Sequence, residues 1–361
     1  MNSTPMPSNP LSALGWQADG PAAQALADLP PGRLARVIEQ HRSGYRVTDG
    51  VNEFPVQSPT EWARRSVLAD ERAAVGDWVW LEPIRDHIVR WLPRHSLLSR
   101  GAAGEHYKLQ LIAANIDAVL VVVGLDGDFN PRRLERYLLL TRGSGAVTVF
   151  VLTKADQCSD VEAQLAQLDG LREQGCPVLA LNAKDPASAA LLAAWTGPGS
   201  SVVLVGSSGA GKSTLTNCLL GVERQKTAEV RSTDSRGRHT TTYRSLIGLP
   251  SGGCLIDTPG MRELKLTGEE DLAEGGFDDV EAVMGQCRFS DCAHASEPGC
   301  AVLAALESGA LTALRLAHYF KLQGELAEAA GGLAAQRARR AVEKVGNRNF
   351  GKRPTEKYGK R

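Results

Sequence analysis

The hydrophobic pattern of the first third of the chain predicts a small β-rich domain. Between residues 33 and 100, short apolar or alternating stretches are separated by turn signals, and no run of helical periodicity interrupts them. The stretches cover residues 34–38, 45–47, 75–81 and 88–92. We predict a β-barrel over residues 32–105, with an oligonucleotide-binding (OB) barrel as the favoured version. A β-module that only packs on its neighbour fits the same pattern.

The pattern changes in the middle of the chain, where continuous apolar runs of strand length replace the alternating ones. Segments of helical character at residues 132–142 and 161–174 lie between these runs, which is typical of βαβ units around a buried parallel sheet. Two more strands, 243–249 and 254–256, predict a hairpin that adds an antiparallel edge. The continuous runs cover residues 116–125, 146–152, 177–181 and 201–205. Together they predict an α/β domain over residues 106–270.

The two ends of the chain have other compositions. Residues 1–31 are rich in Pro, Ser and Ala and predict a disordered extension. Residues 271–345 predict a helical domain, in which Ser308 is expected to cap a helix that places His318 in the core or an interface. Residues 346–361 form a basic tail. Such a tail is attracted to phosphate-rich surfaces, although a solvated, disordered end has the same composition.

Length and composition narrow the class of protein. The chain has 361 residues, enough for two or three domains, and its formal net charge of +0 argues neither for nor against nucleic acid. Its apolar runs are too short to span a bilayer, and its start lacks a secretory signal. Of the seven cysteines, three cluster with a histidine, as expected for reduced thiols and a metal site. We therefore expect a cytoplasmic protein without membrane contact.

A phosphate-binding loop follows the run 201–205. The pattern G-x-x-x-x-G-K-[ST] stands between a predicted strand and a predicted helix start, which is the context that this motif requires. Backbone N–H groups of such a loop turn inward on phosphates, and the helix dipole adds to the attraction. Lys212 is expected to reach the β- and γ-phosphates and Ser213 to ligate Mg²⁺. The predicted phosphate-site residues are Gly206, Ser207, Ser208, Gly209, Ala210, Gly211, Lys212, Ser213 and Thr214.

A second motif, D-T-P-G at residues 257–260, follows the predicted strand 254–256. Asp257 at the strand end is expected to hold Mg²⁺, directly or through water, and the Gly260 N–H to sense the γ-phosphate. The next residue is Met261, where a glutamine commonly orients the attacking water. Because a thioether cannot orient water usefully, we expect slow intrinsic turnover.

A guanine-reading loop is predicted after the run 146–152. Its sequence is Thr153-Lys154-Ala155-Asp156. The Asp156 carboxylate can accept the two edge donors of guanine as a bidentate pair, which adenine does not offer. Thr153 stands where asparagine is usual, and its shorter side chain is expected to weaken the bonding between loops. The second base-contacting loop is expected at Asn182, Ala183 and Lys184, where Ser-Ala-Lys is commoner.

A polar segment, G-R-H-T-T-T at residues 237–242, is the predicted switch. One of its threonines, for which we take Thr241, is expected to close on Mg²⁺ and the γ-phosphate. His239 is the candidate catalytic residue, positioning or activating the water that Met261 cannot orient. The alternative is that His239 is an ordinary exposed loop histidine.

The order of these motifs is reversed from that of most GTPases, because the guanine-reading loop precedes the phosphate loop. A doubly wound sheet can gather the loops in one crevice whatever their chain order, since all of them leave carboxyl ends of strands. The order therefore predicts a circular permutation. It also runs residues 257–260 directly into the cysteine-bearing segment, so that loss of the γ-phosphate could reposition that segment.

The cysteine cluster predicts a structural zinc site. Cys287, Cys292, His294 and Cys300 follow the pattern C-x4-C-x-H-x5-C. Three thiolates and one imidazole form a closed tetrahedral shell that suits Zn²⁺ and leaves no open position for chemistry. Free, unligated cysteines are the alternative.

These pieces together resemble the family of ribosome small-subunit-dependent GTPase A, also called RsgA, YjeQ or EngC. The marks are V-G-D at 75–77, P-R-H-S at 93–96, the permuted order, the switch segment and the cysteine cluster. The resemblance implies an OB barrel, a permuted GTPase domain and a zinc-bearing helical domain. It also implies hydrolysis of GTP to GDP and phosphate, stimulated by the small ribosomal subunit and its rRNA late in assembly. In the family, the histidine matching His239 is proposed to serve where glutamine is missing.

Three alternatives stay open. One is a nucleotide-gated RNA-binding assembly scaffold with incidental hydrolysis. Another is an ATPase or kinase, against which Asp156 argues. The last is a permuted GTPase of the large subunit, which the barrel and the cysteine cluster fit poorly. We expect a monomer.

Overall fold

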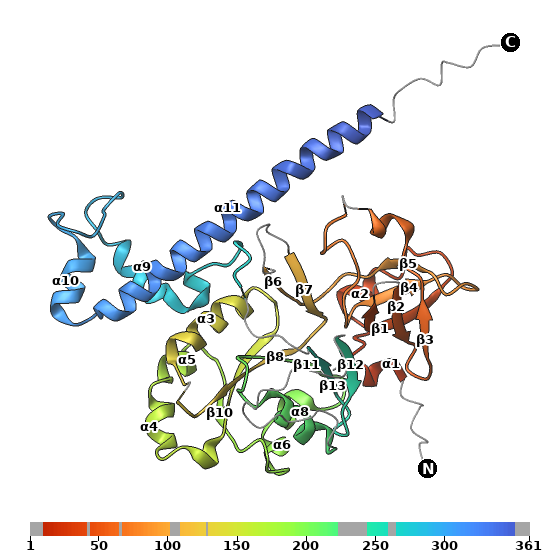
Figure 1. Ribbon diagram of the computed structural model, residues 1–361, viewed down its shortest axis with the longest axis horizontal. Coiled ribbons are helices and arrows are strands. Elements are labelled where there is room, and N and C mark those ends of the chain that lie inside the picture. The colour runs from red at the N-terminus through yellow and green to blue at the C-terminus, as the bar shows by residue number, and fades with distance from the viewer. Residues whose placement is uncertain are drawn as a thin grey trace, which may run out of the picture.

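The computed structural model describes residues 10–41, 44–64, 67–101, 109–127, 129–222, 244–258 and 265–350, with side chains as far as Arg339. Three parts are visible in Figure 1: a β-barrel, an α/β domain beside it, and a helical part from which the long helix α11 extends (Figure 1). Among the described residues, no helix has both the length and the hydrophobicity to cross a bilayer.

Five strands form the barrel. They are β1 (Arg33–His41), β2 (Gly44–Thr48), β3 (Glu53–Val56), β4 (Trp78–Leu81) and β5 (Ile88–Trp91). Strand β1 pairs with both β2 and β4, while β3 pairs with β2 and β5 with β4, all antiparallel. A parallel bridge between Gln57 and His87 closes the ring. Because alternate side chains of β1 and β2 point inward, Ala35, Val37 and Val47 are fully buried in its centre.

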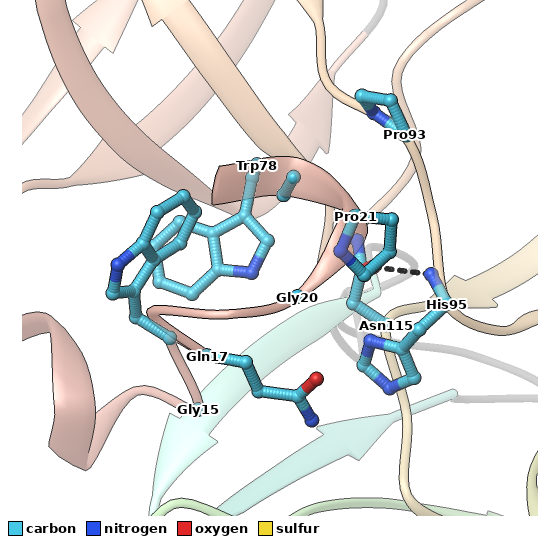
Figure 2. Close-up of a pocket in the computed structure, with 10 residues that line it drawn as sticks. Gly15, Gln17, Gly20, Pro21, Trp78, Pro93, His95 and Asn115 are labelled. Carbon is cyan, nitrogen blue, oxygen red and sulfur yellow. Dashed lines mark hydrogen bonds between the residues drawn. The ribbon is translucent and has the colours of Figure 1, made fainter. Parts of the chain in front are cut away.

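The N-terminal segment is ordered from residue 10, so the prediction of a disordered extension over residues 1–31 is wrong for residues 10–31. Two short helices, α1 (Pro10–Ala13) and α2 (Pro21–Gln24), lie against the barrel. Trp16 packs edge-on against Trp78 of the barrel, with ring centroids 4.9 Å apart. Figure 2 shows Trp78 beside Pro21 of this segment. The prediction from Pro- and Ala-rich composition overlooked a few large apolar side chains in this segment. Those side chains bury enough apolar surface against the barrel to order the segment.

One buried arginine joins the barrel to the α/β domain. Arg36 of β1 is fully buried and donates hydrogen bonds to the carbonyls of Gly76 (3.1 Å) and Asn115 (2.8 Å). It also donates to Ser201 Oγ (2.8 Å) and to the carbonyl of Leu14 in the N-terminal segment. Burial lowers the pKa of Arg36. A buried charge needs this many partners to offset its desolvation, so Arg36 fixes the three segments relative to one another.

The α/β domain contains the predicted parallel sheet, in the order β10-β9-β8-β11-β13-β12. Its strands are β8 (Ala118–Gly124), β9 (Val147–Thr153), β10 (Val178–Ala180), β11 (Ser201–Val205), β12 (Ser245–Gly248) and β13 (Cys254–Asp257). The first five in this order run parallel, and β12 is antiparallel to β13, as the hairpin prediction required. However, β12 is not a free edge, because Ser245 pairs with Glu39 of β1 and makes the two sheets continuous.

Helices cover both faces of this sheet. They are α3 (Pro131–Arg142), α4 (Val161–Ala166), α5 (Asp169–Glu173), α6 (Ser188–Leu191), α7 (Ala193–Thr196) and α8 (Lys212–Leu220). The single helix predicted over 161–174 is broken at Gln167 and Leu168, between α4 and α5, directly before Asp169 and Gly170, which are poor helix formers. Further short elements are η1 (Thr60–Ala63), η2 (Ala155–Gln157), and the hairpin of β6 (Leu97–Gly101) with β7 (Leu109–Ala114).

The helical part comprises η3 (Ala273–Phe277), α9 (Asp278–Met284), α10 (Ala301–Ser308) and α11 (Ala313–Phe350). Ser308 ends α10 and does not cap α11, contrary to expectation. The turn at Gly309 (φ 76°) separates the two helices, and the Thr312 hydroxyl caps α11 by accepting the Arg315 N–H at 3.1 Å. Helix α11 also continues past residue 345, where the sequence predicted the start of a separate tail.

Candidate nucleotide and metal sites

The phosphate loop lies between β11 and α8, at the carboxyl edge of the parallel sheet. Its three glycines have positive φ angles: Gly206 143°, Gly209 81° and Gly211 89°. A Cβ atom on Gly206 would lie 2.1 Å from the Val122 carbonyl oxygen of the neighbouring strand. Glycine favours this backbone path, which is typical of loops that form a cradle for phosphates with their N–H groups.

Lys212 lies across the mouth of this cradle. Its Nζ donates to the carbonyl oxygens of Gly206 (2.7 Å) and Ser207 (2.6 Å). Burial lowers the pKa of Lys212 to about 8. Two neutral carbonyls satisfy the ammonium only partly, so phosphate oxygens would be stronger partners.

The predicted guanine-reading loop lies beside the phosphate loop. Thr153 is fully buried, and its hydroxyl donates to the Ala210 carbonyl at 2.6 Å. The threonine therefore bonds to the phosphate loop directly, and the expected weakening relative to asparagine stays a prediction. Lys154 adopts a left-handed conformation (φ 61°), and its Nζ lies 2.5 Å from Asp126 Oδ2. Asp156 follows in η2 with its side chain exposed at the surface.

The second predicted base loop adjoins the first. Ala155 N–H donates to the Leu181 carbonyl at 3.3 Å, which joins the two loops directly. The Asn182 Oδ1 atom accepts the Lys184 N–H at 2.9 Å and fixes the turn. Parallel strands β9 and β10 thus bring both predicted base-contacting loops to the same edge as the phosphate loop.

The magnesium and switch candidates are only partly described. Asp257 ends β13, next to β11, on the same edge as the phosphate loop, and Ser213 and Thr214 begin helix α8. Gly260 and Met261 lie outside the described residues, as does the segment 237–242 with His239 and Thr241.

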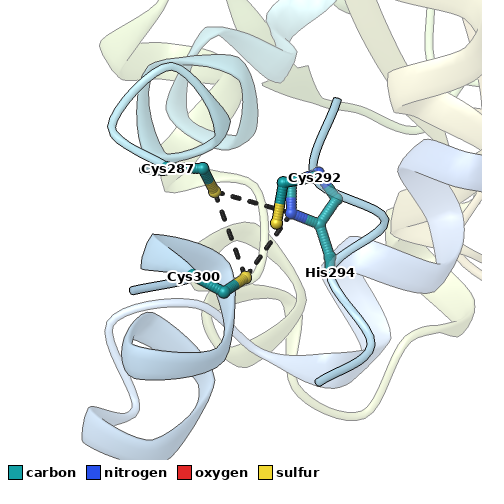
Figure 3. Close-up of side chains that lie close together, drawn as sticks. All are labelled: Cys287, Cys292, His294 and Cys300. Atoms are coloured by element: carbon teal, nitrogen blue, oxygen red, sulfur yellow. Dashed lines mark hydrogen bonds between the residues drawn. The ribbon is translucent and has the colours of Figure 1, made fainter. Parts of the chain in front are cut away.

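The cysteine cluster comes together as predicted. The ligand atoms of Cys287, Cys292, His294 and Cys300 all lie within 4.8 Å of one another. Figure 3 shows the four side chains pointing toward a common centre. The Cys287 and Cys300 sulfurs are 4.0 Å apart, and each lies 3.6 Å from His294 Nδ1. A tetrahedral site with metal–sulfur bonds of about 2.3 Å separates its sulfurs by about 3.8 Å. The donor set and its dimensions therefore fit a single metal ion.

A carboxylate that sequence analysis missed organises the loop of this cluster. Glu297 accepts the backbone N–H groups of Ser296 (3.0 Å), Ala293 (2.9 Å) and Ala295 (2.9 Å). These bonds lower the pKa of Glu297 to about 2. They surround His294, whose φ of 58° is unusual for a residue other than glycine. The side-chain bonds of Glu297 hold the histidine in this conformation.

Comparison with known proteins identifies the family. The RsgA GTPase model matches residues 91–267. Curated relatives named small ribosomal subunit biogenesis GTPase RsgA match nearly the whole chain. The relative from Xanthomonas oryzae pv. oryzae (strain PXO99A) is 58% identical over 350 residues, 95% of each chain. That from Xanthomonas euvesicatoria pv. vesicatoria is 56% identical over 360 residues, 98% of each. The chain belongs to the RsgA GTPase family. As an RsgA family member, it is an enzyme that hydrolyses GTP.

Solved structures agree with the RsgA assignment. YjeQ from Thermotoga maritima matches with a TM-score of 0.56 at 26% identity, covering 82% of this chain and 99% of that one. YloQ, a circularly permuted GTPase, matches with a TM-score of 0.55 at 23% identity, covering 82% of this chain and 96% of that one, and supports the fold. An ABC transporter model also matches residues 196–360. That range contains the phosphate loop, a motif common to many nucleotide-binding families.

Proposed function

We propose that this RsgA-family GTPase binds the small ribosomal subunit and acts late in its maturation, with the subunit stimulating GTP hydrolysis. The observation that carries the proposal is the permuted arrangement of the base and phosphate loops on one sheet edge. The proposal is supported by full-length similarity to proteins named for small-subunit biogenesis. We further propose that the protein is cytoplasmic and monomeric.

In the proposed site, the phosphate loop, with Thr214, binds the phosphates of GTP through its N–H groups, and Lys212 neutralises the β- and γ-phosphates. Ser213 and Asp257 would hold Mg²⁺, which supplies charge neutralisation when bound. Asp156 accepts the guanine edge, while the Lys154 stem lies over the base. Thr153 fixes the base loop to the phosphate loop, and the segment 182–184 closes the other side of the base.

We also propose that the barrel has an OB fold and contacts rRNA, and that the cysteine cluster holds structural Zn²⁺. The barrel's strand order and its parallel closing bridge support the first statement. A Cys3His donor set with no open ligand position supports the second.

Isolated small subunits are expected to raise the turnover number for GTP by at least about tenfold, because a binding partner can supply groups that stabilise phosphoryl transfer. The measurement is phosphate release with the protein alone, with small subunits, and with large subunits as the specificity control. Unchanged turnover with small subunits would favour the alternative, an RNA-binding assembly scaffold in which hydrolysis is incidental.

His239→Ala is expected to lower the subunit-stimulated turnover by about a hundredfold, the usual contribution of a residue that positions or activates water. GTP affinity, measured by equilibrium binding, should change less than twofold. Binding of the variant to small subunits should also be unchanged, which separates a defect in hydrolysis from a defect in assembly of the complex. If stimulated turnover is the same in His239→Ala and the wild type, His239 is a bystander.

A further inference from the structure

Helix α3 touches the phosphate loop at its first turn. Asn130 caps the helix by accepting the Arg132 N–H at 3.1 Å, so the start of the helix is fixed. One residue later, Arg133 Nη1 lies 3.2 Å from Ser207 Oγ, and this contact is partly buried. An arginine from helix α3 therefore supports the phosphate loop through the side chain of Ser207.

The same helix holds the long C-terminal helix α11. Glu135 Oε1 accepts from Arg315 Nη1, and Glu135 Oε2 is paired with His318 Nδ1, both at 2.7 Å. Arg136 forms an ion pair with Glu325, two turns further along α11. These pairs are partly shielded from water, since the side chains of His318 and Arg315 are only 9% and 18% exposed.

Apolar packing makes this junction rigid. Leu139 of α3 packs closely on Gly275 of η3. A Cβ atom added to Gly275 would lie only 2.4 Å from the Leu139 side chain. Phe277 is fully buried, with the Arg315 guanidinium 4.1 Å from the centre of its ring. Close packing transmits small displacements instead of absorbing them.

We propose that Arg133 is a positioning residue for the phosphate loop, and that α3 couples this loop to the C-terminal helix α11 through Glu135 and Arg136. The proposal rests on the proposed role of residues 206–213 in binding GTP. It differs from the route along the chain, in which residues 257–260 pull on the cysteine-bearing segment that follows them.

The hydrogen bonds of Lys212 explain why the phosphate loop needs the contact between Arg133 and Ser207. The Lys212 ammonium links the carbonyls of Gly206 and Ser207 and holds the loop from inside. Phosphate oxygens draw the ammonium away from those carbonyls. Arg133 then remains as a contact on Ser207 from the side of α3. Any shift of Ser207 on nucleotide binding is passed to Arg133, and along α3 to the residues that hold α11.

Arg133→Ala is expected to weaken binding of GTP and GDP alike, by about tenfold, because both nucleotides depend on a preorganised loop. The change in turnover number should be smaller than the change in affinity, and Arg133→Lys should recover part of the affinity. Arg132→Ala is the matched control, since Arg132 is an exposed arginine in the same turn of α3. Ser207→Ala should weaken binding similarly, and the double variant should be no weaker than either single one.

The coupling is tested by hydrogen exchange of the first turns of α11, from Ala313 to Glu325, with and without saturating non-hydrolysable GTP. Exchange should respond to nucleotide in the wild type and in Arg132→Ala. In Arg133→Ala and Glu135→Gln the response should be lost, although both variants are saturated with nucleotide. A full response in these variants, or nucleotide affinity unchanged in both Arg133→Ala and Ser207→Ala, would overturn the proposal. Lys212→Ala distinguishes failure of the proposed coupling from failure of the proposed GTP site, because normal GTP binding by that variant would refute the site itself.

Discussion

Lys212→Ala is expected to reduce GTP affinity and GTP turnover each by about 10²- to 10³-fold, which makes it the most damaging single change in the nucleotide site. Removal of one preorganised donor from a charged transition state commonly has an effect of this size. The structure adds a reason specific to this chain. The Lys212 Nζ donates to the carbonyls of Gly206 and Ser207, so it lies on the loop where we propose that phosphate oxygens bind.

Lys321→Ala is the control, because Lys321 is an exposed lysine of α11, outside the phosphate loop. Equilibrium binding of a fluorescent GTP analogue and phosphate release measure the two effects. Affinity within about twofold of the wild type in Lys212→Ala would mean that residues 206–213 are not the phosphate site.

The pH dependence of GTP binding follows from the same lysine. Burial lowers the pKa of Lys212 to about 8, and bound phosphates would favour the charged form. GTP affinity should therefore be nearly constant below pH 8 and fall as pH rises through about 8, because the neutral amine must first take up a proton. For folding the sign is opposite. The folded pKa lies below the unfolded value of 10.5, so this group's contribution to stability increases between pH 8 and 10.5. The fall in affinity should be absent from Lys212→Ala.

Those parts of the fold and site that depend on local sequence pattern were predictable. The continuous apolar runs gave the parallel strands β8 to β11, because a strand buried on both faces must be apolar throughout. The glycines at 206, 209 and 211 predict the loop conformation, because few other residues adopt positive φ angles. The spacing of the cysteines predicts a shared ligand shell, because such a cluster has few other uses.

Contacts between distant segments were not predictable. Nothing in the sequence around Arg133 indicates that its guanidinium meets Ser207, 74 residues further along the chain. Arg36 and Leu14 likewise meet only because the barrel and the N-terminal segment pack together. The order of residues 10–31 depends on several contacts with the barrel, among them that of Trp16 with Trp78, and the composition of the segment indicates none of them. The 2.6 Å bond from the Thr153 hydroxyl to the Ala210 carbonyl likewise joins two loops that lie far apart in the sequence.

Cys292→Ser is expected to abolish stoichiometric metal binding and to unfold the segment between α9 and α10. Structural zinc sites contribute apparent binding free energies of about 10–16 kcal/mol, shared among four ligands. Loss of one thiolate should therefore lower metal affinity by at least about a hundredfold, equivalent to about 3 kcal/mol. Cys158→Ser is the matched control, because Cys158 is a half-buried free cysteine outside the cluster.

The local arrangement indicates which structure fails when the metal is lost. The Cys300 sulfur accepts the Leu303 N–H at 3.5 Å and caps helix α10, so the same thiolate serves the metal and the helix. Glu297 holds the loop around His294 without the metal, which should leave residual order between residues 293 and 297. Metal analysis by mass spectrometry, with hydrogen exchange of residues 285–308, distinguishes the outcomes. Chelation of the wild type should reproduce the exchange pattern of Cys292→Ser. A full complement of metal in Cys292→Ser would show that three ligands suffice. Unchanged exchange without metal would show that the segment is held by packing against the core residues Val280 and Val302, which are both fully buried.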